Sequence, residues 1–518
     1  MDEKNYDTSA TPSAGEEGDR SIADGEEMAP QQSRVESIWP AENISRPREY
    51  LMVFVACMAQ FCTQASFTGA LYHLSVIGRS FGVTNPGQLA WLVAGYSLTV
   101  GTFILFSGRL GDAFGYKRML LIGLTWFSLW SVVVGLSVYS NFVLIVFARV
   151  LQGIGPAICL PNALAILGSM YPPGHRKAMV FACFGAVAPI GGVLGAAVAA
   201  AISLAWWPWI WWALSIWLVV LIVLGYIAIP DLSRKVDVFA DGYSLRKLNE
   251  ELDLPGAVTG VISLVLFNFA WNQAPIVGWA TPETIVPLVL GIATFGVFAW
   301  IEINVATKPL LPFDAINGQV GFVLGTVACG WATFGIWILY LVLILQEIRG
   351  LSPLQTVAYS APLPISGTIA AIVTGKLLGP FQVRPAVVMT LALAAFTTGI
   401  ILIATVPPNQ IYWGQIFVCT LIIPFGMDMS FPAATLILSN AVKREHQGVA
   451  ASLVNTVVNY SISLGVGFAN TIEIYVNHGD KLAGYRGGLY FGVGLSSLGF
   501  IICLLFLLRE HFTQQKAQ

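Results

Sequence analysis

The sequence predicts an all-α integral membrane protein, and three observations lead to this fold class. Only 10% of the 518 residues are charged and 56% are hydrophobic, whereas a typical soluble domain is about a quarter charged. Long apolar runs fill the chain, each close to the ~20 residues that a membrane-crossing helix needs. Lysine and arginine gather in alternate loops between these runs, as they do in proteins with several membrane helices.

Fourteen apolar runs follow one another, and we expect each to form a membrane-crossing helix. They cover 51–75, 88–107, 119–139, 142–168, 178–203, 209–230, 254–273, 284–304, 319–346, 353–375, 385–406, 411–438, 449–476 and 487–508. In the resulting topology the outer loops hold only Arg79, Arg349, Lys481 and Arg486. The loops on the opposite side hold many more bases, so that side is expected to be the cytosol. Both termini are then expected there as well.

A polar connection at 231–253 divides the chain after the sixth run. We therefore expect an N-terminal six-helix bundle at 50–230, a cytosolic linker at 231–253, two extra helices at 254–304 and a C-terminal six-helix bundle at 305–508. Residues 1–49 hold twelve acids and five bases, which predicts a disordered, acidic cytosolic tail. Residues 509–518 are expected to form a second cytosolic tail.

An internal repeat supports the two bundles. Residues 155–167 align without gaps on 426–438, with glycine, proline and leucine at matching positions, and 108–118 has a degraded copy at 375–384 that lacks the acid. Repeated membrane halves are typical of secondary transporters, whose substrate path runs between them near the midplane. Helices seven and eight are then an inserted pair.

The stretch 108–118 concentrates charges and glycines between two apolar runs. We expect Asp112 just past a helix end, beside three bases, with the glycines allowing close backbone approach and a tight turn. The residues concerned are Gly108, Arg109, Gly111, Asp112, Gly115, Lys117 and Arg118. The alternative is a solvated basic hairpin that merely follows the positive-inside rule.

This stretch resembles the signature loop between the second and third helices of the major facilitator superfamily. The resemblance implies a conformational latch that holds one bundle against the other, and not a substrate site. Over residues 46–508 the chain resembles the fungal fourteen-helix branch of drug:proton antiporters, closest to the subgroup of aminotriazole-resistance proteins, boron exporters and low-affinity ammonium transporters. The runs that carry this are 86–89, 96–103, 151–156, 160–163 and 171–174. The implied fold is two six-helix bundles plus two inserted helices.

Two charged residues lie well inside apolar runs, away from the helix ends, and they are our candidates for proton coupling. Arg149 should cost about 2.5–3.5 kcal/mol on insertion unless it faces the protein interior, and the alternative is that it snorkels to the outer interface. The resemblance ties an arginine of the fourth helix to proton coupling. Asp428 lies between Pro424 and Pro432, well toward the cytosolic side, where it either exchanges a proton or is bonded to freed backbone groups. We do not expect the two to pair directly.

Polar side chains at four-residue spacing predict a lined cavity. Gln60, Gln64 and Thr68 share one face of the first helix, and Asn455 and Asn459 share one face of the thirteenth. Such amides either bind a polar solute or bond to neighbouring helices. Tyr96, Trp331 and Trp337 are further candidates for the same cavity.

Other signals are weaker. The run 185–195 is similar to a proline–glycine motif of antiporters, although helix packing alone explains its small residues. We interpret His73, Glu302 and Glu473 as residues near the membrane interface. The first helix lacks the carboxylate that drug antiporters usually carry there, so coupling falls to Asp428 with Arg149, or the protein is a facilitator.

The prediction is a secondary active transporter that moves a small solute by alternating access, most simply by proton-coupled efflux of a drug, a metabolite or a boric-acid-like solute. Alternatives are low-affinity uptake of ammonium or a similar nitrogen solute, and a transporter-like nutrient sensor. We expect no enzyme activity, cofactor, metal or nucleic-acid partner, since metal-ligand spacings and phosphate-binding motifs are absent from the sequence. We expect a monomer in the plasma membrane.

Overall fold

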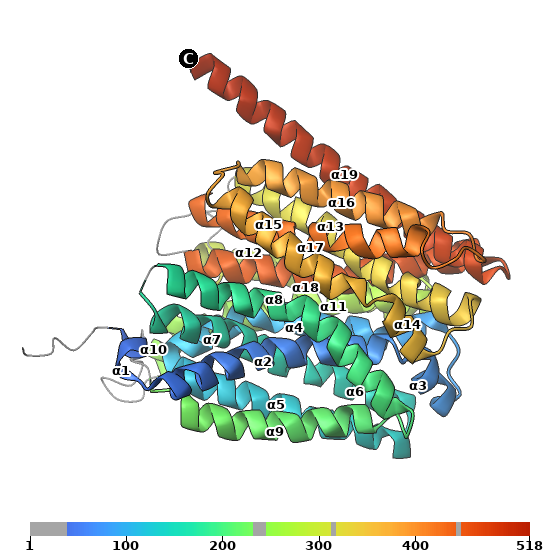
Figure 1. Ribbon diagram of the computed structural model, residues 1–518, viewed down its shortest axis with the longest axis horizontal. Helices are drawn as coiled ribbons and strands as arrows, with labels where there is room; N and C mark the ends of the chain where they lie inside the picture. The colour runs from blue at the N-terminus through green and yellow to red at the C-terminus, as the bar shows by residue number, and fades with distance from the viewer. Residues whose placement is uncertain (1–38, 173, 232–244, 312–317, 442–446, 518) are drawn as a thin grey trace, which may run out of the picture. The chain divides into compact units, whose positions relative to one another are not determined.

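The computed structural model describes residues 39–172, 174–231, 245–311, 318–441 and 447–517, and every regular element in these ranges is a helix (Figure 1). Thirteen helices in the described part are long and apolar enough to cross a membrane, which confirms the predicted class. The remaining expected span, 449–476, forms α18 (Gln447–Asn477), which is long enough but interrupted by asparagines, serines and a glutamate. Most of the expected acidic tail, 1–38, lies outside the described residues.

The N-terminal helices form one packed group. They are α2 (Arg46–Leu71), α4 (Pro86–Phe114), α5 (Tyr116–Leu136), α6 (Phe142–Gln152), α7 (Ile154–Met170), α8 (His175–Ser203) and α9 (Trp209–Ala228), with short α1 (Pro40–Asn43) and α3 (Leu74–Phe81). A Cβ on Gly195 of α8 would lie 2.3 Å from Cβ of Ala65 in α2. The small residues of the 185–195 run therefore allow close packing of α8 on α2, as the simpler interpretation of that run predicted.

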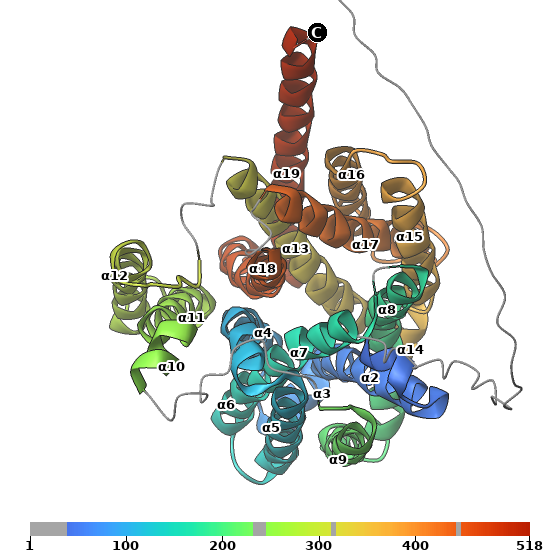
Figure 2. The same cartoon turned by 90° about the vertical axis from the view of Figure 1, so that its left-hand side faces the viewer.

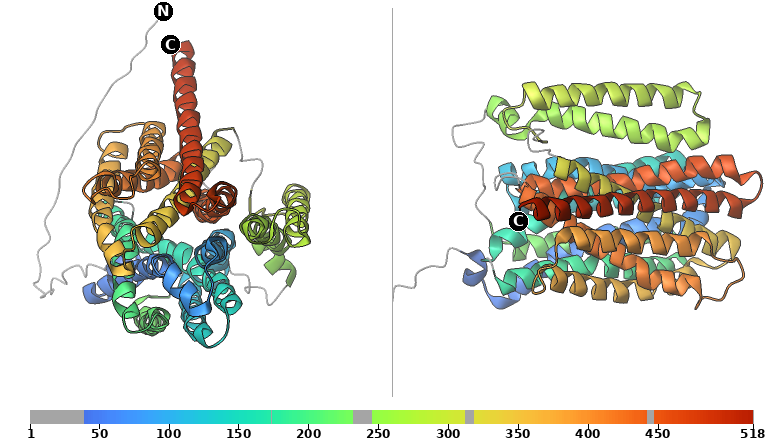
Figure 3. Two further views of the ribbon diagram at one scale, coloured as in Figure 1. Left: turned by 90° about the vertical axis from the view of Figure 1, so that its right-hand side faces the viewer. Right: turned by 90° about the horizontal axis from the view of Figure 1, so that it is seen from above.

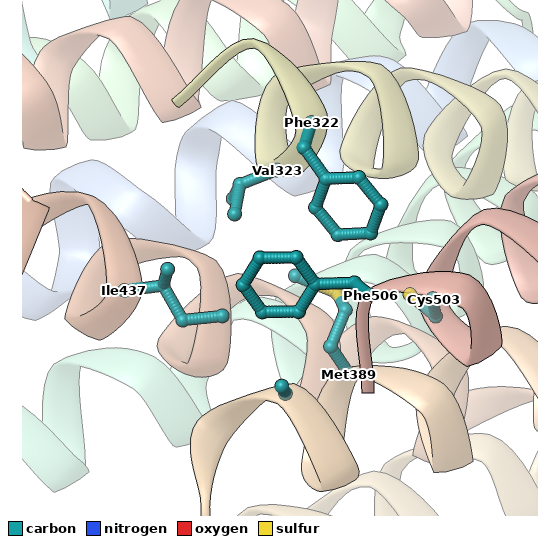
Figure 4. Close-up of a pocket in the computed structure, with 7 residues that line it drawn as sticks. Phe322, Val323, Met389, Ile437, Cys503 and Phe506 are labelled. Atoms are coloured by element: carbon teal, nitrogen blue, oxygen red, sulfur yellow. The ribbon is translucent and has the colours of Figure 1, made fainter. Parts of the chain in front are cut away.

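The C-terminal helices form a second packed group. They are α13 (Gly318–Leu343), α14 (Pro353–Tyr359), α15 (Pro362–Leu378), α16 (Pro385–Ala404), α17 (Gln415–Ala441), α18 and α19 (Lys481–Ala517), and a π-helix, η3 (Ile344–Ile348), continues α13. A narrow pocket, without room for a solute, lies between α13, α16, α17 and α19 (Figure 4). Its lining is apolar, and the rings of Phe322 and Phe506 stack beside it at 4.5 Å. It therefore offers a polar solute no hydrogen bond.

The inserted pair is α11 (Leu254–Val277) and α12 (Pro282–Asn304), preceded by the short α10 (Leu245–Leu252). In Figures 2 and 3 the two long helices lie side by side, and α11 packs against both α4 and α18. Part of the expected linker, 232–244, lies outside the described residues. The pair therefore meets the bundles where a helix of the N-terminal group touches one of the C-terminal group.

Local chemistry explains most helix starts and breaks. Asn85 and Asn141 cap α4 and α6 through their side-chain oxygens, and Ser352 forms a capping box with Gln355 at α14. Three expected helices are interrupted: 51–75 becomes α2 and α3, 142–168 becomes α6 and α7, and 353–375 becomes α14 and α15. Apolar content continues across each break, so hydropathy alone did not predict them.

Both expected tails are shorter than predicted. Helix α2 begins at Arg46, with Pro47 in its first turn, so residues 46–49 are helical and not disordered. Helix α19 continues past 508 to Ala517. We call the end of the helices that holds the turn at Gly115 the Gly115 end. The opposite end, where α2 stops, is the Tyr72 end.

Candidate functional site

The N-terminal and C-terminal groups touch along two seams, α4 with α18 and α8 with α15. In the first seam a Cβ on Gly101 would lie 2.7 Å from the backbone nitrogen of Tyr460 and 3.2 Å from Cβ of Asn459. The two backbones are therefore almost in contact. At the Tyr72 end, the hydroxyls of Tyr72 and Ser360 lie 2.7 Å apart and join α2 to the turn before α15.

The amides predicted to line a cavity differ in their surroundings. Gln60 and Gln64 are partly exposed, and within the described residues their side chains form no hydrogen bond. Thr68 instead donates to the backbone oxygen of Gln64 at 3.0 Å. Asn459 donates to the backbone oxygen of Asn455 at 3.0 Å, and both are partly exposed. Gln60 and Gln64 are thus the cavity candidates whose polar groups are available.

The three aromatic cavity candidates are mostly packed inside the bundles. Tyr96 is buried and donates to the backbone oxygen of Thr63 at 3.0 Å. Trp337 is completely buried, with its indole N–H directed at Sγ of Cys419, 3.1 Å away. Trp331 is partly exposed, but its buried indole nitrogen has no partner in the described part of the chain. None of the three therefore presents an exposed polar group to a solute.

Arg149 lies in the interior of the N-terminal bundle, completely buried, so it does not snorkel to the interface. Nε donates to the backbone oxygen of Leu92 at 2.9 Å, and Nη1 donates to Oγ of Ser66 at 2.8 Å and to the side-chain oxygen of Gln152. The guanidinium also lies 4.3 Å from the ring centre of Tyr96. Its charge is thus distributed among neutral oxygens and an aromatic face, and no ion pair joins it to a described carboxylate.

Asp428 lies midway along α17, 13 residues from Gln415 and 13 from Ala441. This corrects the expectation of a position near the cytosolic side, because α17 begins and ends later than the apolar run. Oδ2 is buried and has no hydrogen-bond partner among the described residues. A Cβ on Gly367 of α15 would lie 2.9 Å from this oxygen and 3.2 Å from Cβ of Pro189 in α8. Asp428 therefore lies beside the α8–α15 seam.

Most of the signature stretch is helical, which corrects the expectation that Asp112 lies just past a helix end. Residues 108–114 form the last two turns of α4, the turn is the single Gly115 at φ 95°, and Tyr116 begins α5. Asp112 is therefore inside the helix, where Tyr116 donates its hydroxyl hydrogen to Oδ1 at 2.5 Å. A Cβ on Gly111 would collide with Oδ1 of Asn162 at 2.0 Å. The second and third glycines are thus required, for close approach and for the positive φ.

The bases of this stretch reach different partners. Arg109 donates from Nη1 to the backbone oxygen of Lys308 at 2.6 Å and from Nη2 to that of Pro309. Lys117 pairs with Asp231 at 3.3 Å, and Arg118 is exposed. Gly108 faces α18, since its Cβ would lie 3.6 Å from Oγ of Ser452. The stretch therefore touches both the C-terminal group and the segment after the inserted pair.

Three residues interpreted as interfacial are in fact buried. His73 bonds to the backbone oxygen of Gly69 and to Oγ of Ser203, at 2.8 and 2.9 Å. Glu473 accepts from the hydroxyl of Tyr340 at 2.9 Å. Glu302 accepts from the backbone N–H of Leu311 at 3.0 Å. All three lie near helix ends, as interpreted, and the sequence did not predict that their side chains bond within the protein.

Glu49 was not singled out from the sequence, although it is 3% exposed. It accepts from the hydroxyl of Tyr171 at 2.8 Å and pairs with Arg176. Burial, together with the Glu49 hydrogen bond, raises the pKa of Tyr171. These contacts join α2 to Tyr171, in the connection before α8, and to the first turn of α8 at the Gly115 end. The only sign of Glu49 in the sequence is that it is an acid directly before an apolar run.

The sequence and fold match known transporters. The family model for the Major Facilitator Superfamily matches residues 53–466. The chain is 51% identical to the low affinity ammonium transporter of Saccharomyces cerevisiae, over 88% of this chain and 89% of the relative. It is 40% identical to the efflux pump terG of Aspergillus terreus, over 92% and 90% of the two chains. A crystal structure of a POT family transporter in complex with 5-aminolevulinic acid is 12% identical with a TM-score of 0.65, over 88% and 95% of the two chains.

Proposed function

Because the chain belongs to the major facilitator superfamily and is a membrane transporter, we propose that it moves a small polar solute by alternating access and couples that movement to a proton on Asp428. The observation that carries the proposal is the position of this carboxyl group. It is midway along α17, its Oδ2 is buried without a hydrogen-bond partner among the described residues, and it adjoins the seam between Pro189 of α8 and Gly367 of α15.

A carboxylate in this position is costly when it is charged and unpaired, and binding a proton removes that cost. The seam between α8 and α15 separates the two bundles, so its packing changes when the bundles rock against each other. Water then gains or loses access to Asp428 in step with the conformation. This supplies proton exchange without the first-helix carboxylate that the sequence lacks.

Gln60 and Gln64 are the groups proposed to bind the solute. Both are partly exposed, and their side-chain polar atoms are not used within the described residues. Both side chains are neutral amides. Neutral amides select hydrogen-bonding solutes of little or no net charge, which fits a small metabolite or a boric-acid-like molecule. Asn455 and Asn459 belong to α18, where Asn459 packs against Gly101 of α4.

The orientation we propose puts the Gly115 end in the cytosol, because Lys117, Arg118, Arg176 and Lys177 lie there. Both termini are then cytosolic, in a monomer of the plasma membrane. The signature stretch acts as the latch: Gly108 lies against α18, Gly111 against α7, and Arg109 against the segment after α12.

Export is our first assignment, and low-affinity uptake of ammonium is the second. A specific observation favours the second: the ammonium transporter of Saccharomyces cerevisiae is 51% identical over 88% of this chain, against 40% for the efflux pump terG. Flux of ammonium and of candidate export solutes into vesicles that contain the full chain, with an imposed proton gradient, separates the two.

The test of coupling is the same flux with Asp428→Asn. We expect the imposed proton gradient to drive solute uphill in the native chain and not in the variant, while exchange of solute down its own gradient persists. Asp480→Asn is the matched control, because Asp480 is exposed and the asparagine preserves its cap at α19. Native flux that is unchanged when the gradient is collapsed contradicts proton coupling.

A further inference from the structure

Arg109 is the base of the signature stretch with the most complete set of partners. Its two terminal nitrogens donate to the backbone oxygens of Lys308 and Pro309, which lie in the segment after α12. A guanidinium that forms two parallel hydrogen bonds fixes the position and the orientation of its partner. Helix α4 is therefore attached at its Gly115 end to the inserted pair and not only to the two bundles.

Two buried carboxylates organise the segment that Arg109 holds. Asp253 is 5% exposed; Oδ1 caps α11 by accepting from the N–H of Gly256 at 3.2 Å, and Oδ2 accepts from that of Leu310 at 3.4 Å. Glu302 is 4% exposed and accepts from the N–H of Leu311 at 3.0 Å. The two acids thus hold consecutive amides of one segment, directly after the carbonyls that bind Arg109.

The two acids also lie close to each other. The base of the segment, Lys308, is paired with Glu251 at 2.6 Å. A Cβ on Gly256 would lie 2.3 Å from Oδ2 of Asp253 and 2.5 Å from Oε1 of Glu302, so these oxygens are less than about 5 Å apart.

The inserted pair also contacts the opposite bundle. Asn272 of α11 donates to the backbone oxygen of Ser463 in α18 at 3.4 Å, and Ser463 donates to Oδ1 of Asn268 at 2.9 Å. On the other side Leu248 and Leu252 of α10 pack on the last turns of α4, where Leu110 and Phe114 lie. The pair therefore bridges α4 and α18, the helices of the first seam.

We propose that the inserted helices are a working part of the latch, in which Asp253 and Glu302 position the 308–311 segment to bind Arg109 and so hold α4 against α18 at the Gly115 end. This proposal rests on the transport function given above. It assigns the inserted pair a role: opening at the Gly115 end requires Arg109 to leave the carbonyls of Lys308 and Pro309. Asp253 and Glu302 are positioning residues, since they act through the segment.

The test uses the full-length protein in nanodiscs and in transport vesicles, with Asp253→Asn and Glu302→Gln. Asparagine preserves the cap of α11 and tolerates the positive φ of 47° at this position, so Asp253→Asn keeps the fold. We expect hydrogen–deuterium exchange in 105–118 and 306–311 to rise about fivefold, as one charge-assisted contact is weakened. Vmax should fall about tenfold with KM unchanged, the pattern of a conformational step.

Glu283→Gln is the matched control, because Glu283 is an exposed acid at the other end of α12. It should leave both exchange and transport as in the native chain. Native exchange in both Asp253→Asn and Glu302→Gln overturns the proposal, and so does a rise in KM at constant Vmax. A native protein that carries none of the tested solutes refutes the proposed function, while the exchange result still decides the role of the inserted pair.

Discussion

The hydroxyls of Tyr72 and Ser360 lie 2.7 Å apart, and both residues are buried, although 288 positions separate them in the chain. Gln346 strengthens the same junction by donating to the backbone oxygen of Tyr72 at 2.8 Å. These contacts close the Tyr72 end between the N-terminal and C-terminal helices. The structure therefore represents a state in which this end is shut.

Tyr72→Phe should favour opening of the Tyr72 end. The variant keeps the ring and removes one buried hydrogen bond, which contributes about 1 kcal/mol, so the opening equilibrium should shift about fivefold. Hydrogen exchange in 353–361 measures the shift. Tyr412→Phe is the control, because its hydroxyl bonds to Tyr359 within the C-terminal group, at 3.1 Å. Equal exchange in both variants would remove Tyr72 from the closure.

Gly367→Ala should reduce transport about tenfold or more. The added Cβ would lie 2.9 Å from Oδ2 of Asp428 and 3.2 Å from Pro189, so α8 and α15 must separate where they now touch. Gly375→Ala in the same helix meets no atom within 4 Å and should be neutral or stabilising. Initial rates of solute flux compare the two. If Gly367→Ala transported the solute at the native rate, close contact between α8 and α15 at this position would not be required for transport.

Asp112→Asn should lower transport without changing solute preference. The substitution removes the charge that accepts the short hydrogen bond from Tyr116, at 2.5 Å, in the last turn of α4. The measurement is the ratio of rates for two solutes, in the variant and in the native chain. A changed ratio would place Asp112 in the solute path. Tyr116→Phe, which removes only the donor, should have a smaller effect.

The helical membrane fold could be predicted because a run of about 20 apolar residues has few stable alternatives in a bilayer. The positions of the breaks within these helices could not be predicted. Gly153 separates α6 from α7, and a Cβ there would lie 2.4 Å from the backbone oxygen of Tyr96, a contact set by another helix. Likewise the buried Glu473 accepts a hydrogen bond from Tyr340, which lies 133 residues earlier in the chain. Burial of a polar group depends on partners that spacing does not reveal.

Of the candidate site, the sequence predicted that Arg149 and Asp428 lie within apolar helices, which they do, but not what surrounds them. Arg149 donates to oxygens of Leu92, Ser66 and Gln152, while its Nη2 has no partner among the described residues. Leu92 and Ser66 belong to other helices, so the periodicity of α6 does not predict these two contacts. Trp337 differs from its prediction in another way: it was expected to line a cavity, but it is buried against Cys419.

Arg149→Lys should destabilise the protein by about 2–4 kcal/mol. A lysine has no planar fork, so it cannot replace the bonds to Leu92, Ser66 and Gln152 together, and buried acceptors are left unpaired. Thermal unfolding of the detergent-solubilised protein measures the loss. Arg79→Lys is the control, since Arg79 is exposed. An unchanged melting temperature in Arg149→Lys would show that the network is structurally dispensable.

His73 makes stability fall as the medium is acidified. It lies just beyond α2, completely buried, and burial lowers its pKa from 6.5 to about 4. Between these values the unfolded chain binds a proton at His73 and the folded chain does not, so stability is full above pH 6.5 and decreases toward pH 4. The loss is at most about 3 kcal/mol. Melting temperatures at pH 7.5 and pH ~4.5 should therefore differ more for the native chain than for His73→Gln, and equal differences would show that His73 does not titrate on unfolding.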